Sequence, residues 1–234
     1  MIDDGPLFKQ GLCRAVESFE RDMKISPWWP RLARVDQDGY CRWRFEETVF
    51  RFALGVRKLI EAAKISIEVQ AVNIEVGWAP LRGKSYPDTL TYDRIDRLYD
   101  LDRIQERTIS LVNFCNSVIH SFTLVAGVDV GRFKRVYMRD FFFASDRQRR
   151  EGVLHMTWQT FRQCVVLPVV ADELITTRWF RTGDGKELRI PSSRGDDFDL
   201  EEAVELYMNL STGNKKAVER FIAAFRAEYG ASPF

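Results

Sequence analysis

The chain has 234 residues, with 35 Lys and Arg against 34 Asp and Glu, and 45% of its residues are hydrophobic. A chain of this size and composition buries a sizeable core, which excludes a disordered, collagen-like or disulfide-dependent protein. A net charge of +1 excludes a footprint for nucleic acid or anionic membrane over the whole surface, and it leaves open a local patch.

The sequence carries no targeting or metal-binding signal. Its amino terminus has two acids and no apolar run of signal-peptide length, and no stretch of about 18 apolar residues occurs that could span a membrane. Four widely spaced cysteines without a CxxC pair, together with two histidines, argue against zinc. We therefore expect a cytoplasmic protein with free thiols, no membrane partner, no metal and no cofactor.

The first elements are helical. Apolar residues at helical spacing predict a helix over 12–24, and the aromatic, turn-rich residues 28–43 predict a linker or a small hairpin about Asp38–Gly39. A second helix begins at Phe45 and runs to about Ala63, with one apolar face and one charged face.

Residues 65–120 predict a strand, a loop and two helices in turn. Residues 65–76 have a period of two with one slip, which predicts a bulged strand; a continuation of the helix is the alternative. Residues 77–92 hold two prolines and two glycines and predict a loop, and 93–100 could form a short helix. After Asp102, apolar spacing predicts a helix to about His120.

The second half is predicted to contain two hairpins around a helix. Residues 121–146 consist of two apolar runs separated by glycines, which is typical of a β-hairpin. A helix capped by Ser145 or Asp146 is expected to continue toward Ile175 with a kink at Pro168. Residues 177–190 predict a second hairpin.

These patterns predict one α+β domain that is predominantly helical, with two antiparallel β-hairpins and a C-terminal pair of helices. By region, we expect an N-terminal helix and aromatic linker over 1–44, the main α+β domain over 45–190, and a C-terminal helical tail over 191–234.

Charge is less balanced by segment than in total. Residues 131–150 carry seven cations and two carboxylates, net +5, whereas residues 194–208 carry six acids and one arginine, net −5. Arginines among aromatic residues suit phosphate contacts and base stacking. The alternatives are a solvated hairpin face, or pairing of the two segments with each other within the chain or across a homodimer.

Asn116 and His120 are the candidate catalytic residues. They are four residues apart near the end of the expected helix, so their side chains share a face. A histidine beside an amide donor could act as general base or acid on an anionic substrate. The structural alternative is that His120 caps the carboxyl end of the helix or bridges to the hairpin, with Asn116 as its partner.

The surrounding segment, NFCNSVIHSF, resembles the Asn-x-x-x-His segment of HEPN-type proteins, the higher eukaryotes and prokaryotes nucleotide-binding superfamily. The resemblance covers about twenty residues, from Arg107 to Val125. It implies a helical, commonly dimeric domain with metal-independent RNA cleavage in active members. Asn116 and His120 match the family pattern, and Cys115 stands where the family has an arginine.

A thiol carries no positive charge, so a phosphate-binding guanidinium must come from elsewhere in the chain. The candidates are Arg107, Arg132, Arg135 and Arg139. The other histidine, His155, has apolar neighbours and is interpreted as a half-buried structural residue.

The resulting hypothesis is a divergent HEPN-like ribonuclease of a defence or toxin system, or an inactive RNA-binding relative. The rival, from a different class, is a non-enzymatic protein-interaction subunit of a larger assembly that uses the basic and acidic segments to bind partners.

Overall fold

The computed structural model describes residues 5–24, 34–130, 136–172, 174–181 and 187–193. The chain divides into two compact units, residues 1–172 and 173–234, and each is described by itself. Within the described part of the chain, no helix is long and apolar enough to cross a membrane.

The first unit is built on a five-stranded sheet in which every neighbouring pair is antiparallel, in the order β2-β1-β5-β4-β3. Its strands are β1 Asn73–Pro80, β2 Gln105–Ser110, β3 Ser121–Val130, β4 Val136–Ser145 and β5 Gly152–Thr157. The α+β class is thus confirmed. The predominantly helical description is wrong, because one continuous sheet organises the unit in place of a lone hairpin.

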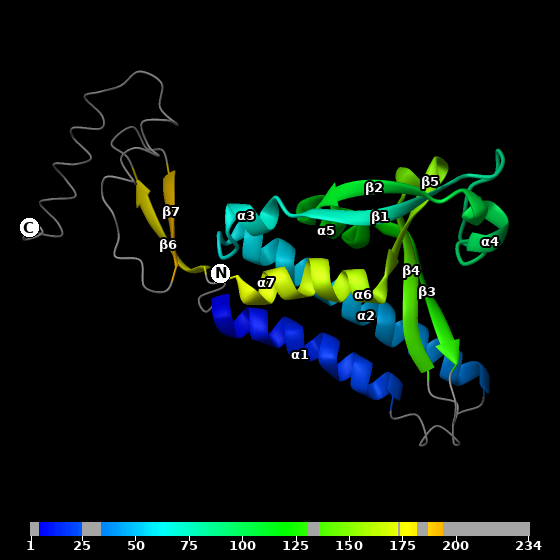
Figure 1. Cartoon of the computed structure of the whole chain (residues 1–234), viewed down its shortest axis with the longest axis horizontal. Coiled ribbons are helices and arrows are strands. Elements are labelled where there is room, and N and C mark those ends of the chain that lie inside the picture. Colours follow the sequence, from blue (N-terminus) through cyan, green and yellow to red (C-terminus); the bar gives the residue numbers. More distant parts are fainter. Residues whose placement is uncertain (1–4, 25–33, 131–135, 173, 182–186, 194–234) are drawn as a thin grey trace, which may run out of the picture. The chain divides into compact units, whose positions relative to one another are not determined.

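Helices pack on one face of this sheet. Helix α1 runs along α2 and also contacts α7, and α2 packs on α5 (Figure 1). The short helices α3 and α4 lie before and after β1 along the chain. The helices are α1 Gly5–Lys24, α2 Arg34–Glu61, α3 Ile67–Gln70, α4 Ile95–Leu98, α5 Leu111–Ile119, α6 Trp158–Thr160 and α7 Leu167–Ala171.

An aromatic cluster fills the space between the helices and the inner face of the sheet. Phe141 and Phe143 of β4 are fully buried there, since alternate residues of a strand point to one face. The Phe141 ring lies 5.5 Å from Phe45 of α2 and 5.8 Å from Phe161, and the Phe143 ring lies 5.6 Å from Phe114 of α5. These ring contacts tie α2 and α5 to the sheet.

Two predicted helices are strands for part of their length. The helix expected from Asp102 to His120 begins only at Leu111, because residues 105–110 form the edge strand β2. Most of that strand is exposed, so it carries no apolar alternation, and its structure comes from pairing with β1. The helix expected after Ser145 begins only at Trp158, because residues 152–157 form β5. This strand is covered on both faces and reads as an apolar run without a clear period.

Two predictions around α2 and β1 are also wrong. The hairpin about Asp38–Gly39 is part of α2. Residues 67–70 are helical, with Ser66 as N-cap, and β1 starts only at residue 73. The strand then continues through Gly77, where a side chain would lie 2.6 Å from Ile104, to Pro80, so the predicted loop starts later than expected.

Several predictions are confirmed. They are the helix over 12–24, the end of the second helix near residue 61, the short helix within 93–100, and the hairpin of β3 and β4. Just before Pro168, the helical run widens into a π-helical stretch, η4 Phe161–Val166, at the position of the expected kink.

The second unit contains the predicted second hairpin, formed by β6 Leu174–Arg181 and β7 Glu187–Ser193. The predicted C-terminal helices fall on residues 194–234, which lie outside the described residues. The domain boundaries at 44 and 190 stay a prediction.

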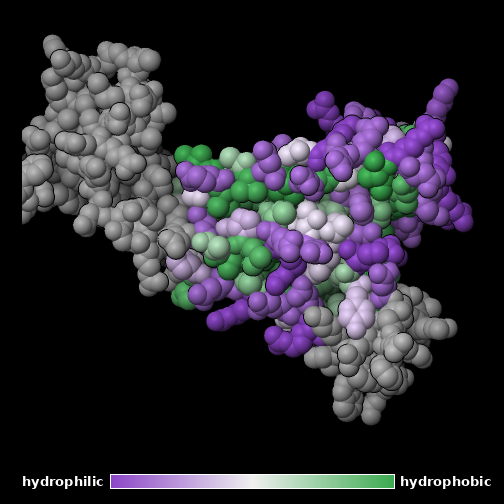
Figure 2. All heavy atoms as spheres, viewed as in Figure 1, coloured by the Kyte–Doolittle hydropathy of each residue, from purple (hydrophilic) through white to green (hydrophobic). Residues whose placement is uncertain are grey.

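The surface of the first unit is uneven in polarity. Figure 2 shows hydrophilic residues over β1 and β2, and apolar residues gathered over α3 and α7. Ile67 of α3 is 70% exposed, and Leu167 of α7 is also exposed.

Candidate functional site: a cavity at the end of α5

Helix α5 separates a buried face from a polar one. Its N-cap is Ser110, whose Oγ accepts a hydrogen bond of 3.2 Å from the backbone N–H of Asn113. The buried face packs against α2 and β4 through Leu111, Phe114, Cys115 and Val118. The other face presents Asn113, Asn116, Ser117 and His120, which follow one another at helical spacing.

This polar face lines an open cavity of about 590 Å³. Ser145, the last residue of β4, and residues 146–148, which follow it, form another part of the lining, together with Ile109 near the end of β2. The register of the hairpin explains the meeting. Because Ser121 pairs with Ser145, the residue before β3 and the residues after β4 come together. His120 and Arg147 therefore line one cavity.

His120 lies at the C-cap of α5, where the backbone leaves the helical conformation with φ −100° and ψ 22°. Its backbone N–H donates to the carbonyls of Asn116 and Val118, so the main chain, and not the imidazole, ends the helix. The imidazole is exposed and makes no hydrogen bond or ion pair in the described part of the chain. The ring therefore remains available to a ligand.

Asn116 is held from the opposite side by α2. Arg57 donates a hydrogen bond of 3.0 Å from Nη1 to the Asn116 Oδ1, and its Nε lies 3.3 Å from Glu61 Oε1. With Oδ1 engaged, the Asn116 amide nitrogen is the group left to donate to a ligand. Sequence reasoning missed Arg57 because it lies 59 residues away in the chain.

Cys115, at the family's arginine position, belongs to the core. It is fully buried, and burial raises the pKa of its thiol to about 12, although nearby Arg57 opposes this shift. A neutral, buried thiol cannot contact a phosphate in the cavity.

None of the described candidate arginines lines this cavity. Arg107 lies on β2 with its guanidinium 4.0 Å from the centre of the Trp78 ring. Arg139 lies on β4 and is bound to two aspartates. Arg132 and Arg135 lie outside the described residues. The guanidinium that lines the cavity belongs to Arg147, which is exposed and has no partner in the described part of the chain.

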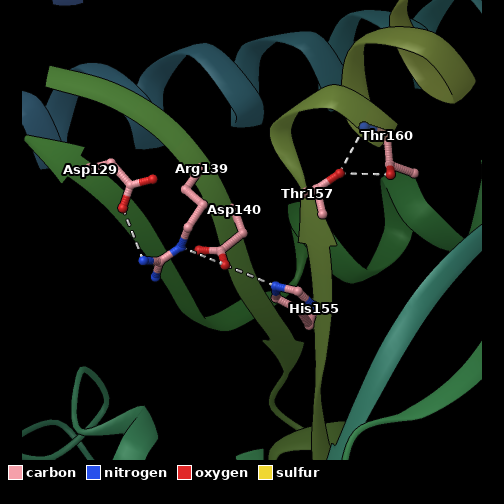
Figure 3. A network of polar contacts seen from close by, with 6 residues as sticks. All are labelled: Asp129, Arg139, Asp140, His155, Thr157 and Thr160. Carbon is pink, nitrogen blue, oxygen red and sulfur yellow. Dashed lines mark hydrogen bonds and ion pairs between the residues drawn. The ribbon is translucent and has the colours of Figure 1, made fainter. Parts of the chain in front are cut away.

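The second histidine takes part in a separate polar network on the outer face of the sheet (Figure 3). His155 Nε2 lies 3.1 Å from Asp140 Oδ2, which also accepts a hydrogen bond of 3.0 Å from Arg139 Nε. Arg139 in turn donates to Asp129 over 3.1 Å. The His155 ring stacks 4.7 Å from Phe142, and its side chain is 19% exposed. His155 is half-buried and bonded, as expected for a structural residue.

A glycine makes room for this network. A side chain at Gly127 would place its Cβ 1.8 Å from Asp140 Oδ1. That oxygen is buried and has no hydrogen-bond partner in the described residues. Nothing in the sequence pattern identified Asp140 as the partner of His155, because the pairing depends on the register of β4 and β5.

In the described part of the chain, no three His, Cys, Asp or Glu side chains come together as ligands for a metal ion. No family model, curated protein or solved structure matches the chain.

Proposed function

We propose that the chain binds RNA at the α5 cavity and cleaves it without a metal, as a divergent HEPN-like ribonuclease of a defence or toxin system. The observation that supports the proposal best is that Arg147, which has no partner among the described residues, lines the same cavity as Asn116 and His120. An imidazole can act as the base in cleavage of a phosphodiester, and an amide donor and a guanidinium can stabilise the charge that develops on its oxygens.

In the proposed reaction, His120 accepts the proton of a ribose 2′-hydroxyl. The 2′-oxygen then forms a bond to the adjacent phosphorus, the bond from phosphorus to the 5′-oxygen breaks, and the leaving 5′-oxygen takes a proton from water. The products are a 2′,3′-cyclic phosphate and a 5′-hydroxyl. Arg147 and the Asn116 amide would stabilise the charge that develops on the phosphoryl oxygens.

Arg57 has a positioning role in this scheme. Its hydrogen bond orients the Asn116 amide, and the guanidinium lies on the α2 side of Asn116. Arg57 thereby supports the donor without contacting RNA.

The experiment is incubation of single-stranded RNA with the full chain in EDTA, followed by analysis of product ends. We expect cyclic phosphate ends, and a loss of rate of about 10²- to 10⁴-fold in His120→Ala, the range for a general base. Cleavage that survives this substitution would overturn the site assignment. RNA binding without cleavage would identify an inactive relative, and absence of both would favour the protein-interaction subunit.

A further inference from the structure

A second cavity, of about 580 Å³, lies between α2 and the start of β3. Helix α2 contributes Trp43, Glu46, Glu47 and Phe50, which follow one another at the spacing of one helical face. Tyr92 and Phe122 complete an aromatic lining. We call this space the aromatic cavity.

Two of the four aromatic rings of this cavity are exposed, whereas Tyr92 and Phe122 are half-buried and the Arg149 guanidinium lies over the Phe122 ring, 3.7 Å from its centre. Trp43 is 54% exposed and Phe50 is 41% exposed, although aromatic side chains gain free energy by burial. Tyr92 is held in place by Arg42, whose Nη1 donates to its hydroxyl over 3.4 Å. Exposed ring faces around a cavity are suited to stacking with a flat ligand, since stacking tolerates any ring.

The two carboxylates of the cavity differ in their partners. Glu47 accepts a hydrogen bond of 2.7 Å from Arg44. Glu46 makes no hydrogen bond or ion pair in the described part of the chain. Partial burial raises the pKa of Glu46, against a smaller opposing effect of Arg42. A partly desolvated carboxylate of this kind gains most from a ligand that supplies hydrogen-bond donors.

Consecutive residues at the junction of α5 and β3 line the two cavities. Ile119, Ser121 and Phe122 line the aromatic cavity, and His120, between them in the chain, lines the other. The charged side chains that have no partner in the described part of the chain differ in sign between the two cavities. They are Arg147 in the α5 cavity, where Asp146 is paired with Arg149, and Glu46 in the aromatic cavity. A phosphate would be attracted to the first and repelled from the second.

We propose that the aromatic cavity binds the base of the nucleotide next to the phosphate held at His120, and that Glu46 selects guanine. Guanine presents two adjacent N–H donors, at N1 and N2, which match the two oxygens of a carboxylate. Adenine and uracil each lack this pair of donors. The inference rests on the proposed function for its substrate, and it adds base specificity to the same site.

The test separates base binding from cleavage. Binding of 5′-GMP and 5′-AMP is measured by isothermal titration calorimetry, with the full chain and without RNA. We expect 5′-GMP to bind at least about tenfold more tightly than 5′-AMP, because a wrong base leaves the carboxylate unpaired. Glu46→Gln should abolish the difference, since its amide replaces one acceptor by a donor. Glu68→Gln, at an exposed carboxylate on α3, is the matched control and should retain it.

A second variant guards against an indirect effect of Glu46→Gln. Phe50→Ala should weaken both nucleotides, by about tenfold from lost stacking, and leave the preference for guanine. Equal binding of both nucleotides by the unmodified chain, or an unchanged preference in Glu46→Gln, would overturn the inference. Guanine-selective binding without any RNA cleavage would instead refute the proposed function and leave the base site standing.

Discussion

The two histidines of the chain lie in opposite surroundings. His120 lies at the end of a helix, where its exposed ring lines a cavity with an amide and with a guanidinium that has no partner among the described residues. His155 lies within a strand, stacked on Phe142 and bonded to Asp140. The first has free hydrogen-bonding capacity and the second has used much of its own.

The comparison shows that a hydrogen bond between a carboxylate and a histidine does not by itself indicate a catalytic site. Both oxygens of Asp140 are enclosed by the protein, one by Arg139 and His155 and the other by Gly127. Such a pair joins β4 to β5 and fixes their register. At His120, by contrast, the fold supplies neighbours and leaves their ligand-binding atoms open.

Apart from substitution of His120 itself, the largest expected effect concerns Arg147. Arg147→Ala should lower the rate of RNA cleavage by about 10²- to 10³-fold, since removal of one donor to a developing oxyanion has an effect of this size. Arg107→Ala removes an exposed arginine outside the cavity and should have little effect. Single-turnover rates measure both. Equal losses in the two variants would mean that Arg147 acts only through the charge of the whole surface.

A substitution at Gly127 tests the other side of the comparison. Gly127→Ala should reduce the free energy of unfolding by about 1–3 kcal/mol, because the added methyl overlaps the Asp140 carboxylate. Gly83→Ala, where nothing lies within 4 Å, is the control. In an Asp140→Ala background the cost should shrink, as urea denaturation of all four combinations can show. Full additivity would contradict the assigned overlap.

The reactivity of Cys115 tests whether its thiol is buried behind α5 or faces the α5 cavity. Its thiol should react with a maleimide at pH 8 only after unfolding, because it is buried and its pKa is raised to about 12. The folded pKa exceeds the unfolded one, so this group's contribution to stability is complete below about pH 8.5 and declines as the pH rises toward 12. Mass spectrometry of the labelled protein measures the first effect. Rapid labelling of Cys115 in the native chain would show that it faces the cavity.

The smallest expected effect concerns Arg139. Its side chain is 55% exposed, so Arg139→Ala should lower the free energy of unfolding by less than about 1 kcal/mol. Thermal denaturation checks this value, and the cleavage rate should not change. A large loss of activity would place Arg139 back among the phosphate-binding residues, as the sequence suggested.

Elements with a clear internal period could be predicted from sequence. Helix α1 and residues 45–61 of α2 show a continuous apolar face. The hairpin of β3 and β4 shows two apolar runs around glycines. Strands β2 and β5 could not be predicted, because one is an exposed edge and the other is covered on both faces. Their conformation depends on their neighbours, which local spacing does not reveal.

The candidate site was predictable only in part. The spacing of Asn116 and His120 already brings them together on one helical face, whereas Arg57 meets Asn116 through the packing of α2 on α5. Arg147 could have been identified from the sequence, because it lies just after the second strand of the predicted hairpin and His120 lies just before the first. A register that pairs Ser121 with Ser145 brings the residues just outside the pair together as well.

The most direct test compares the two histidines in one experiment, with metal-free RNA cleavage and unfolding free energy measured for the original chain, His120→Ala and His155→Ala. We expect the cleavage rate of His120→Ala to fall by at least about a hundredfold, and its free energy of unfolding to stay within about 0.5 kcal/mol of the original. His155→Ala should keep its cleavage rate and lose about 1–3 kcal/mol, because the Asp140 carboxylate loses a partner. Cleavage that depends on His155 and not on His120 would contradict the account.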